Sequence, residues 1–350
     1  MTTPMPADAA ASPGTAALEA LMARGAAFLG TRYAILGGAM SWVSERHLVA
    51  ALSNAGAFGV IACGAMMPDR LAEEIAATQA LTDKPFGVNL ITMHPNLMEL
   101  VQVCLDAKVG HIVFAGGIPP GPAIKAAKEG GAKVVCFAPA LALAKKLVRS
   151  GADALVIEGS EAGGHIGPVS LTVLAQEILP HIRDVPVFVA GGIGRGEAIL
   201  SYLEMGAAGV QLGTRFVCAA ECVAHPNFKR AFIRGAARDA LPTVQLDETF
   251  PVIPVRALQN EGTRRFLEHQ AEVVRRYKAG ELTKEAGQLD IEHFWAGALR
   301  RAVVDGDIEN GSLMAGQSVG MVTREQPAAE IIAELLQQAV ATVEARRAAG

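Results

Sequence analysis

Short apolar runs recur between residues 34 and 216, and stretches with helical periodicity separate them. Each run holds six to eight residues rich in Val, Ile, Leu and Ala, which is typical of strands buried on both faces of a parallel sheet. The intervening segments 68–80, 140–150 and 172–182 are rich in Ala, Leu, Lys and Glu, which favour amphipathic helices. The pattern predicts eight strands, at 34–40, 58–64, 86–91, 111–116, 132–139, 154–159, 186–192 and 209–216.

Eight strand-helix units within about 190 residues favour an α/β fold of the closed TIM (β/α)8 barrel type, and an open doubly wound sheet is the alternative. After Phe216 the alternation stops, and a polar stretch with basic clusters predicts a helical addition, or lid. An amphipathic helix at 328–347 is expected to close the bottom or the side of the barrel. The predicted organisation is a disordered tail at 1–17, a barrel at 18–216, a helical lid at 217–310 and a returning segment at 311–350.

Charge and hydropathy narrow the range of partners. The 350 residues include 31 Lys and Arg against 35 Asp and Glu, so no basic field exists that would hold a nucleic-acid backbone. The longest apolar runs, such as 134–144, fall short of the roughly 20 residues that cross a bilayer. The N-terminal residues lack the basic and apolar regions of a secretory signal. We therefore expect a cytoplasmic protein that acts on a small molecule, with neither nucleic acid nor membrane as its partner.

The five cysteines do not form a recognisable metal or disulfide pattern. They are scattered, odd in number and include no C-x-x-C pair, so reduced and mostly buried thiols are expected. Cys218, Cys222 and His225 are spaced to share one face of a helical turn, but the neighbouring sequence offers no fourth ligand for a structural zinc. No metal site is predicted.

Most predicted strands end in glycine or in a polar residue, and these ends form the ligand-binding edge of a parallel barrel. The strongest signal there is EGSEAGGHIG at 158–167, in which a glycine pair presents His165 in a loop. An imidazole titrates near neutral pH and serves as a general base or acid. The alternative for His165 is a loop histidine that only hydrogen-bonds to the backbone.

Two further glycine turns follow the seventh strand, AGGIGRG at 190–196, and accompany the eighth, QLGTRF at 211–216. Barrels commonly bind a phosphate at these two positions, through backbone N–H groups and a helix N-terminus. The dinucleotide fingerprint G-x-G-x-x-G is not met, because Glu197 stands where its last glycine is required. The pattern therefore favours a phosphate-bearing ligand without a Rossmann site.

Motifs in matching order along the chain resemble the flavin-dependent barrels that comprise nitronate monooxygenase, also called 2-nitropropane dioxygenase, and the flavin-type enoyl-acyl-carrier-protein reductase. The resemblance covers nearly all of residues 30–330. It argues against the inosine-monophosphate dehydrogenases, which need a nucleophilic cysteine after strand six, where this chain has none between Cys136 and Cys218. The motifs are GGAMSWVS (37–44), LTDKPFGVN (81–89), GADALVIEGSEAGGHIG (151–167), VFVAGGIGRG (187–196), GAAGVQLGTRFV (206–217), AHPNFK (224–229) and SLMAGQSVGMV (312–322).

The resemblance implies FMN as the cofactor, with NADH or NADPH as the electron donor in the reductase branch, and His165 as the catalytic residue. Many nitronate monooxygenases carry Gln where Glu158 stands, so the flavin contact there departs from the pattern of that branch. The residues expected to bind the cofactor are Gly38 and Met40 near the ring, Asn89 and Glu158 at its polar edges, Gly163 and Gly164 beside it, Gly191, Gly192, Gln211, Gly213 and Thr214 along the ribityl phosphate, and Met314, Gly316 and Gln317 as a cover.

Two enzymatic functions share these residues. In the favoured interpretation the protein is an oxidoreductase that converts alkyl nitronates or nitroalkanes and O2 to a carbonyl compound and nitrite. In the alternative it reduces an enoyl thioester on an acyl carrier, or a quinone, with NAD(P)H. A flavin-binding protein without turnover is a third possibility, against which His165 argues.

The sequence identifies binding partners less specifically than it identifies the residues of the site. Basic residues at Arg230, Arg234, Arg264 and Arg275 fit a dock for an acidic acyl carrier, although a solvated helix face explains such charges more simply. The residues do not determine the oligomeric state, and a homodimer is compatible with them.

Overall fold

The structure, a computed structural model, describes residues 12–64 and 66–349. Its main sheet contains eight parallel strands in the order β1-β9-β8-β6-β5-β4-β3-β2. A bridge between Leu36 and Phe58 joins the two outer strands, and Gly37 N and Phe58 N each donate a 2.8 Å hydrogen bond across it. The sheet is therefore a closed TIM barrel, as predicted, and not an open sheet. Its strands are β1 (Ile35–Gly37), β2 (Gly59–Ala62), β3 (Phe86–Ile91), β4 (His111–Ala115), β5 (Lys133–Phe137), β6 (Ala154–Glu158), β8 (Val187–Ala190) and β9 (Gly209–Leu212).

All eight predicted strands are present, but the eighth is shorter than expected. It ends at Leu212, because Thr214–Val217 forms the short helix α9. Helices α3, α6 and α7 also lie where the helical periodicity predicted them. The helices around the barrel are α1 (Pro13–Leu29), α2 (Arg46–Asn54), α3 (Pro68–Leu81), α4 (Leu97–Asp106), α5 (Gly121–Glu129), α6 (Leu141–Arg149), α7 (Leu171–Ile178), α8 (Gly196–Glu204) and α13 (Ala328–Ala349).

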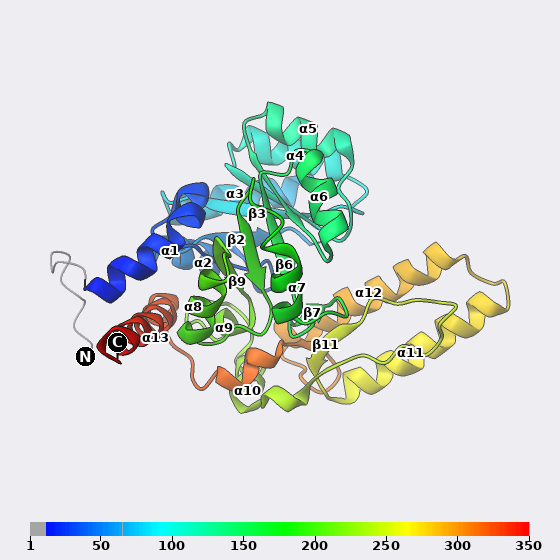
Figure 1. Ribbon diagram of the computed structural model, residues 1–350. Helices are drawn as coiled ribbons and strands as arrows, with labels where there is room; N and C mark the ends of the chain where they lie inside the picture. The colour runs from blue at the N-terminus through cyan, green and yellow to red at the C-terminus, as the bar shows by residue number, and fades with distance from the viewer. Residues whose placement is uncertain (1–11, 65, 350) are drawn as a thin grey trace.

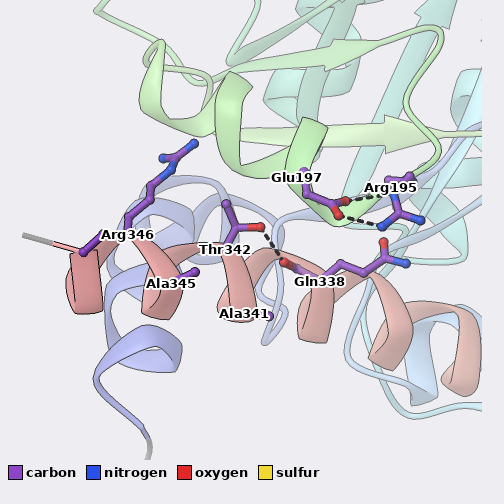
Figure 2. A pocket seen from close by; sticks show the side chains of 8 residues that line it. Arg195, Glu197, Gln338, Ala341, Thr342, Ala345 and Arg346 are labelled. Carbon is purple, nitrogen blue, oxygen red and sulfur yellow. Dashed lines mark hydrogen bonds and ion pairs between the residues drawn. The ribbon is translucent and has the colours of Figure 1, made fainter.

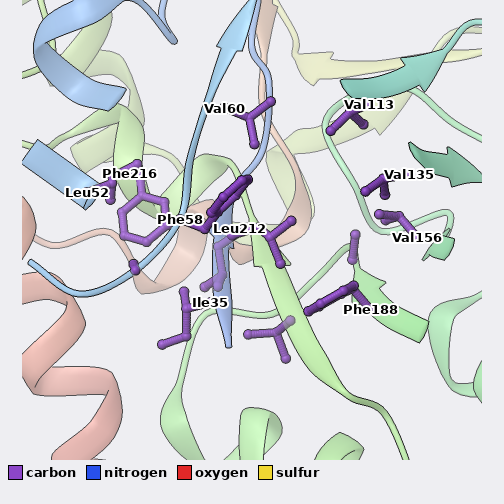
Figure 3. Packing of buried hydrophobic residues seen from close by; sticks show 14 of the residues in the cluster. Ile35, Leu52, Phe58, Val60, Val113, Val135, Val156, Phe188, Leu212 and Phe216 are labelled. Atoms are coloured by element: carbon purple, nitrogen blue, oxygen red, sulfur yellow. The ribbon is translucent and has the colours of Figure 1, made fainter. Parts of the chain in front are cut away.

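The strands are apolar on both faces because one face packs inside the barrel and the other packs under helices. Val113 pairs with Val135, and Val156 pairs with Phe188, on the inner face (Figure 3). Side chains in such a core are close-packed, and fully burying one contributes about 1.5–3 kcal/mol. The sequence therefore reads as almost continuous Val, Ile and Leu along each strand.

Helix α1 covers the N-terminal opening of the barrel. The Phe28 ring lies 5.3 Å from His111 and 6.1 Å from Phe188, two residues of strands that are not neighbours in the sheet. The carbonyl of Phe28 also accepts hydrogen bonds from His111 Nε2 at 3.0 Å and from Lys133 Nζ. Residues 13–17 belong to this helix, so the predicted tail at 1–17 extends too far, and residues 1–11 lie outside the described residues.

Helix α13 takes the place of the eighth barrel helix, on the side of the barrel and not at its bottom. It packs against α8, α1 and α2. Leu335 O would lie only 2.0 Å from a Cβ at Gly196, so the two helices approach closely at that glycine. The chain therefore leaves the barrel after α9 and returns at its end to complete the barrel wall. No helix in the described ranges combines the length and apolar character needed to span a membrane.

The segment between α9 and α13 forms the lid, and it is less helical than predicted. Its strands form a small antiparallel sheet with the loop after β6, and its two long helices extend together away from the barrel (Figure 1). The lid has an apolar core of its own, which includes Phe250, Phe266 and Trp295. Its elements are α10 (Pro226–Arg234), η1 (Ala237–Asp239), β10 (Ala240–Pro242), β11 (Val255–Leu258), α11 (Glu261–Lys278), α12 (Lys284–Val303), β12 (Leu313–Met314) and η2 (Gln317–Met321), and the loop strand is β7 (Gly164–His165).

Candidate active site

Three polar side chains predicted for the site share the inner face of the barrel near its C-terminal mouth. Asn89 pairs in register with Val113, and Glu158 pairs with Ala190, which in turn pairs with Gln211. Paired residues of parallel strands present their side chains to the same face, and the register places all three on the face of Val113. Asn89 and Gln211 are buried, and Asn89 Nδ2 donates to the carbonyl of Val113 at 3.1 Å.

Glu158 ends β6 with its side chain on the inner face of the barrel near the mouth. Desolvation raises its pKa to about 8, and within the described residues neither a hydrogen bond nor a charge opposes this shift. Its side chain is partly accessible at the mouth. At neutral pH Glu158 is therefore mostly a neutral acid that can donate a hydrogen bond to a ligand.

The loop after β1 brings Gly38 and Met40 to the same mouth. A Cβ at Gly38 would lie 3.3 Å from Gln211 Nε2, and one at Gly213 would lie 3.3 Å from Met40 Sδ. The loop is fixed by the buried Ser44, whose hydroxyl donates to Gly38 O at 2.9 Å and accepts from Met40 N at 3.0 Å. The structure thus brings the β1 and β9 ends together, as the sequence predicted.

The loop after β6 and the returning turn meet in the same way. A Cβ at Gly163 would lie 2.5 Å from Gly316 N, so the two backbones pack directly on each other. Gly316 N donates to Thr214 Oγ1 at 3.0 Å, and Gln317 N donates to Glu161 O at 2.9 Å. The cover predicted from the 312–322 motif therefore lies over the β6 and β9 loops. Met314 is close to Gly164, where a Cβ would lie 3.6 Å from its sulfur.

Gly191 and Gly192 follow β8 with φ of +100° and +68°, a conformation that glycine adopts without strain. A Cβ at Gly191 would lie 2.9 Å from Gly159 O, and one at Gly192 would lie 2.9 Å from Glu161 Cβ. These two glycines lie against the β6 loop and so belong to the mouth.

The rest of the 190–196 turn does not belong to the mouth, which corrects the expectation of a phosphate at the following helix. The first N–H of α8, from Gly196, donates to Gln338 Oε1 at 2.8 Å, and α13 covers that helix end. Figure 2 shows the hollow between the two helices, of about 620 Å³, in which Arg195 pairs with Glu197. Gln338 thus occupies the first N–H of this helix, and the expectation of a phosphate stays with the turns at 191–192 and 213–214.

His165 does not lie free in its loop. It forms part of β7, pairs in register with Val255 of β11, and is about 40% exposed. Its Nε2 lies 3.2 Å from Glu292 Oε1, a carboxylate on the lid helix α12. The backbone-only alternative is therefore not what the structure shows, because a side chain from the lid partners the imidazole.

Sequence reasoning missed several residues that hold this arrangement. Glu161 accepts a hydrogen bond from Leu171 N at 2.9 Å and lies beside Gly192. It belongs to the 158–167 motif, but the motif gave no reason to single it out. Arg256 Nε donates to Ser160 O at 2.9 Å and fixes the same loop to β11. Glu292 carried no signal, since 127 residues separate it from His165.

The basic residues of the lid are largely paired. Arg264 forms ion pairs with Glu261 and Glu268, and Arg275 pairs with Glu272 and Glu281. These are contacts within or next to one exposed helix, so solvated helix faces account for them.

Comparison with known proteins places most of the chain in one family. The model of the nitronate monooxygenase family matches residues 23–103 and 95–338. FabK from Thermotoga maritima is similar in structure, with a TM-score of 0.83 and 37% identity over 93% of this chain and 99% of that one. Among curated relatives, a nitronate monooxygenase of Paraburkholderia phytofirmans is 28% identical, over 91% of this chain and 95% of the relative.

A second curated relative carries a different name. The (3aS,4S,5R,7aS)-5-hydroxy-7a-methyl-1-oxo-octahydro-1H-indene-4-carboxyl-CoA dehydrogenase of Mycobacterium tuberculosis is 30% identical, over 89% of this chain and 94% of the relative. These relatives are all oxidoreductases. With a family model that matches from residue 23 to residue 338, the chain belongs to the nitronate monooxygenase family.

Proposed function

We propose that the protein is an FMN-dependent oxidoreductase of the nitronate monooxygenase type, which converts alkyl nitronates or nitroalkanes and O2 to a carbonyl compound and nitrite. The match to the family model over residues 23–338 carries this proposal. The mouth supports it, because loops after β1, β6, β8 and β9 gather the glycines and polar side chains that the resemblance assigns to the cofactor.

The residues at the mouth fit FMN, and enzymes of this family are flavin-dependent. Among the described residues, the Gln211 amide and the Glu158 carboxyl form no side-chain hydrogen bond, so both can bind a ligand. These donors and acceptors match the hydrogen-bonding edge of an isoalloxazine. The backbone N–H groups of the turns at Gly191, Gly192 and Gly213 would hold the phosphate, as in other glycine-rich phosphate turns. Gly163, Met314 and Gly316 would cover the ring. Bound there, FMN would supply the electron transfer that the side chains cannot perform.

The protein's own residues would bind the substrate and move its proton. His165 lies at the end of the β6 loop beside Gly163 and Gly164, the glycines assigned to the flavin ring. A neutral imidazole there accepts the proton from the carbon next to a nitro group, and the resulting nitronate needs no such base.

The second candidate is an NAD(P)H-dependent enoyl-thioester reductase. The 37% identity to FabK, an enoyl-acyl-carrier-protein reductase, favours it, as does Glu158 where many nitronate monooxygenases have Gln. In that reaction His165 would donate a proton and not accept one.

One comparison separates the two candidates. Flavin-loaded protein is assayed aerobically with a nitroalkane and with its preformed nitronate, and anaerobically with NADH or NADPH followed by an enoyl thioester. A monooxygenase oxidises the nitronate and shows slow reduction by nicotinamide. Fast nicotinamide-driven reduction, reoxidation by the enoyl thioester and negligible nitronate oxidation would establish the reductase instead.

The role of His165 is tested in the same assays. His165→Ala should keep the flavin spectrum but lower nitroalkane turnover by about 10²- to 10⁴-fold, the usual contribution of a general base, while the nitronate reaction persists. His181→Ala is the control, since His181 is exposed and follows α7, away from the mouth. Equal losses on both substrates would contradict a role for His165 as base.

A further inference from the structure

The imidazole of His165 faces the lid and not the barrel wall. His165 pairs with Val255 across the antiparallel β7–β11 ladder, and opposed residues present their side chains to the same face of a sheet. Val255 is fully buried in the lid core with Phe250 and Trp295. The ladder therefore directs His165 toward α12, which contributes Trp295 to that core.

Glu292 of α12 is the charged group that contacts the His165 imidazole. Its carboxylate oxygens lie 3.2 Å from His165 Nε2, and within the described residues no other ion pair to His165 is present. Both side chains are only partly exposed, at 40% and 36%. A carboxylate accepts but does not donate, so the neutral imidazole must place its proton on Nε2 to make this bond.

A second contact joins α12 to the loop after β1, at the barrel mouth. The guanidinium of Arg300, two helical turns after Glu292, lies 5.9 Å from the centre of the Trp42 ring in the loop after β1. Trp42 has a φ of +67°, which a bulky residue adopts only where its surroundings impose it. Helix α12 thus contacts the loops after both β1 and β6, which lie at the barrel mouth.

We propose that Glu292 is a positioning residue that fixes the Nε2–H tautomer and the orientation of His165, leaving Nδ1 as the atom that exchanges a proton with the substrate. The identity of the substrate in this inference rests on the proposed function, whereas the assignment of the tautomer is independent of it. In this arrangement a lid helix orients a histidine that lies on the loop after β6, so the lid has a role in the chemistry of the site.

The tautomer is read directly by NMR of protein labelled with ¹⁵N at histidine, with the His165 signals assigned by their absence in His165→Ala. In the wild-type protein above pH 8, the two ring nitrogens should give widely separated shifts, with the proton on Nε2. In Glu292→Ala both tautomers should be populated, so the two shifts should move toward each other. Glu285→Gln, an exposed residue of the same helix without an ion pair among the described residues, should leave them unchanged. Identical shifts in wild type and Glu292→Ala would overturn the proposal.

Kinetics supply the functional readout. Glu292→Ala should lower kcat for a nitroalkane on the order of 10- to 100-fold, the same range as for removing the partner that orients a metal-binding histidine, with little change in KM or in turnover of the nitronate. Glu292→Asp, which keeps an acceptor, should restore part of the loss. A loss confined to KM, or equal on both substrates, would contradict positioning. If no variant or wild-type protein turns over either substrate, the proposed function fails, and the NMR comparison still decides the role of Glu292.

Discussion

Replacing Glu158 by Gln should stabilise the flavin-free protein at alkaline pH. Glu158 is held with a pKa of about 8, against 4.5 in an unfolded chain, because folding desolvates its carboxyl group. Between these two values the folded protein keeps a proton that the unfolded chain has lost. The unfolded state therefore binds fewer protons, and the free energy of unfolding falls as pH rises from 4.5 to 8 and then levels off.

The magnitude follows from the pKa difference. A difference of about 3.5 units corresponds to about 5 kcal/mol at 1.36 kcal/mol per unit, and solvent access at the mouth reduces this to about 2–3 kcal/mol. Gln has nearly the same shape and never ionises. Glu158→Gln should therefore be more stable than wild type by about 2–3 kcal/mol at pH 9 and nearly equal at pH 5, a Tm gain of about 3–4 °C at pH 9 only.

The assay is thermal unfolding of the flavin-free protein at pH 5 and pH 9, so that bound cofactor contributes nothing. Glu177→Gln serves as the control, because Glu177 is exposed on α7 and forms no ion pair within the described residues. Its Tm should follow wild type at both pH values. A Glu158→Gln variant that is less stable than wild type at pH 9, or that differs equally at both pH values, would refute the assignment of a neutral buried acid.

Two further substitutions test the backbone of the mouth. Gly163→Ala should destabilise the protein by about 1–3 kcal/mol, because its methyl group would lie 2.5 Å from Gly316 N. Gly297→Ala in α12 is the control and should stabilise the protein by up to about 1 kcal/mol, because only Arg301 Nη1 lies near the new methyl group, at 3.8 Å. Urea unfolding measures both free energies, and equal effects would contradict the close packing at Gly163. Gly213→Asp should weaken FMN binding at least tenfold in a fluorescence titration, because it sets a carboxylate against the phosphate; unchanged affinity would place the phosphate elsewhere.

The barrel could be predicted because each strand has to be apolar on both faces, and such runs stand out between polar helices. The convergence of Gly38, Asn89, Glu158 and Gln211 followed from the same rule, since parallel strands end at one edge. The lid was less predictable. Its strands are short, and β11 pairs not only with β10 but also with the distant β7 and β12, a non-local arrangement that local periodicity does not contain.

The same limit explains the errors at the site. The glycine string at 190–196 looked like one phosphate turn, but its second half packs under α13, a helix that begins more than 100 residues later. The side chain that contacts His165, Glu292, comes from α12 of the lid, and only the tertiary packing of the lid brings it to the loop after β6. Contacts of this kind depend on how elements pack, and a single sequence does not display them.

The FMN content of the protein tests the central claim most directly. The purified chain, or the flavin-free chain titrated with FMN, should bind one equivalent of non-covalent FMN, which is released by heat and identified by chromatography. Gln211→Ala should weaken this binding, because the amide lies next to Gly38 at the barrel mouth. A colourless protein that takes up no added FMN would contradict the assignment of the barrel mouth as a flavin site and with it the proposed function.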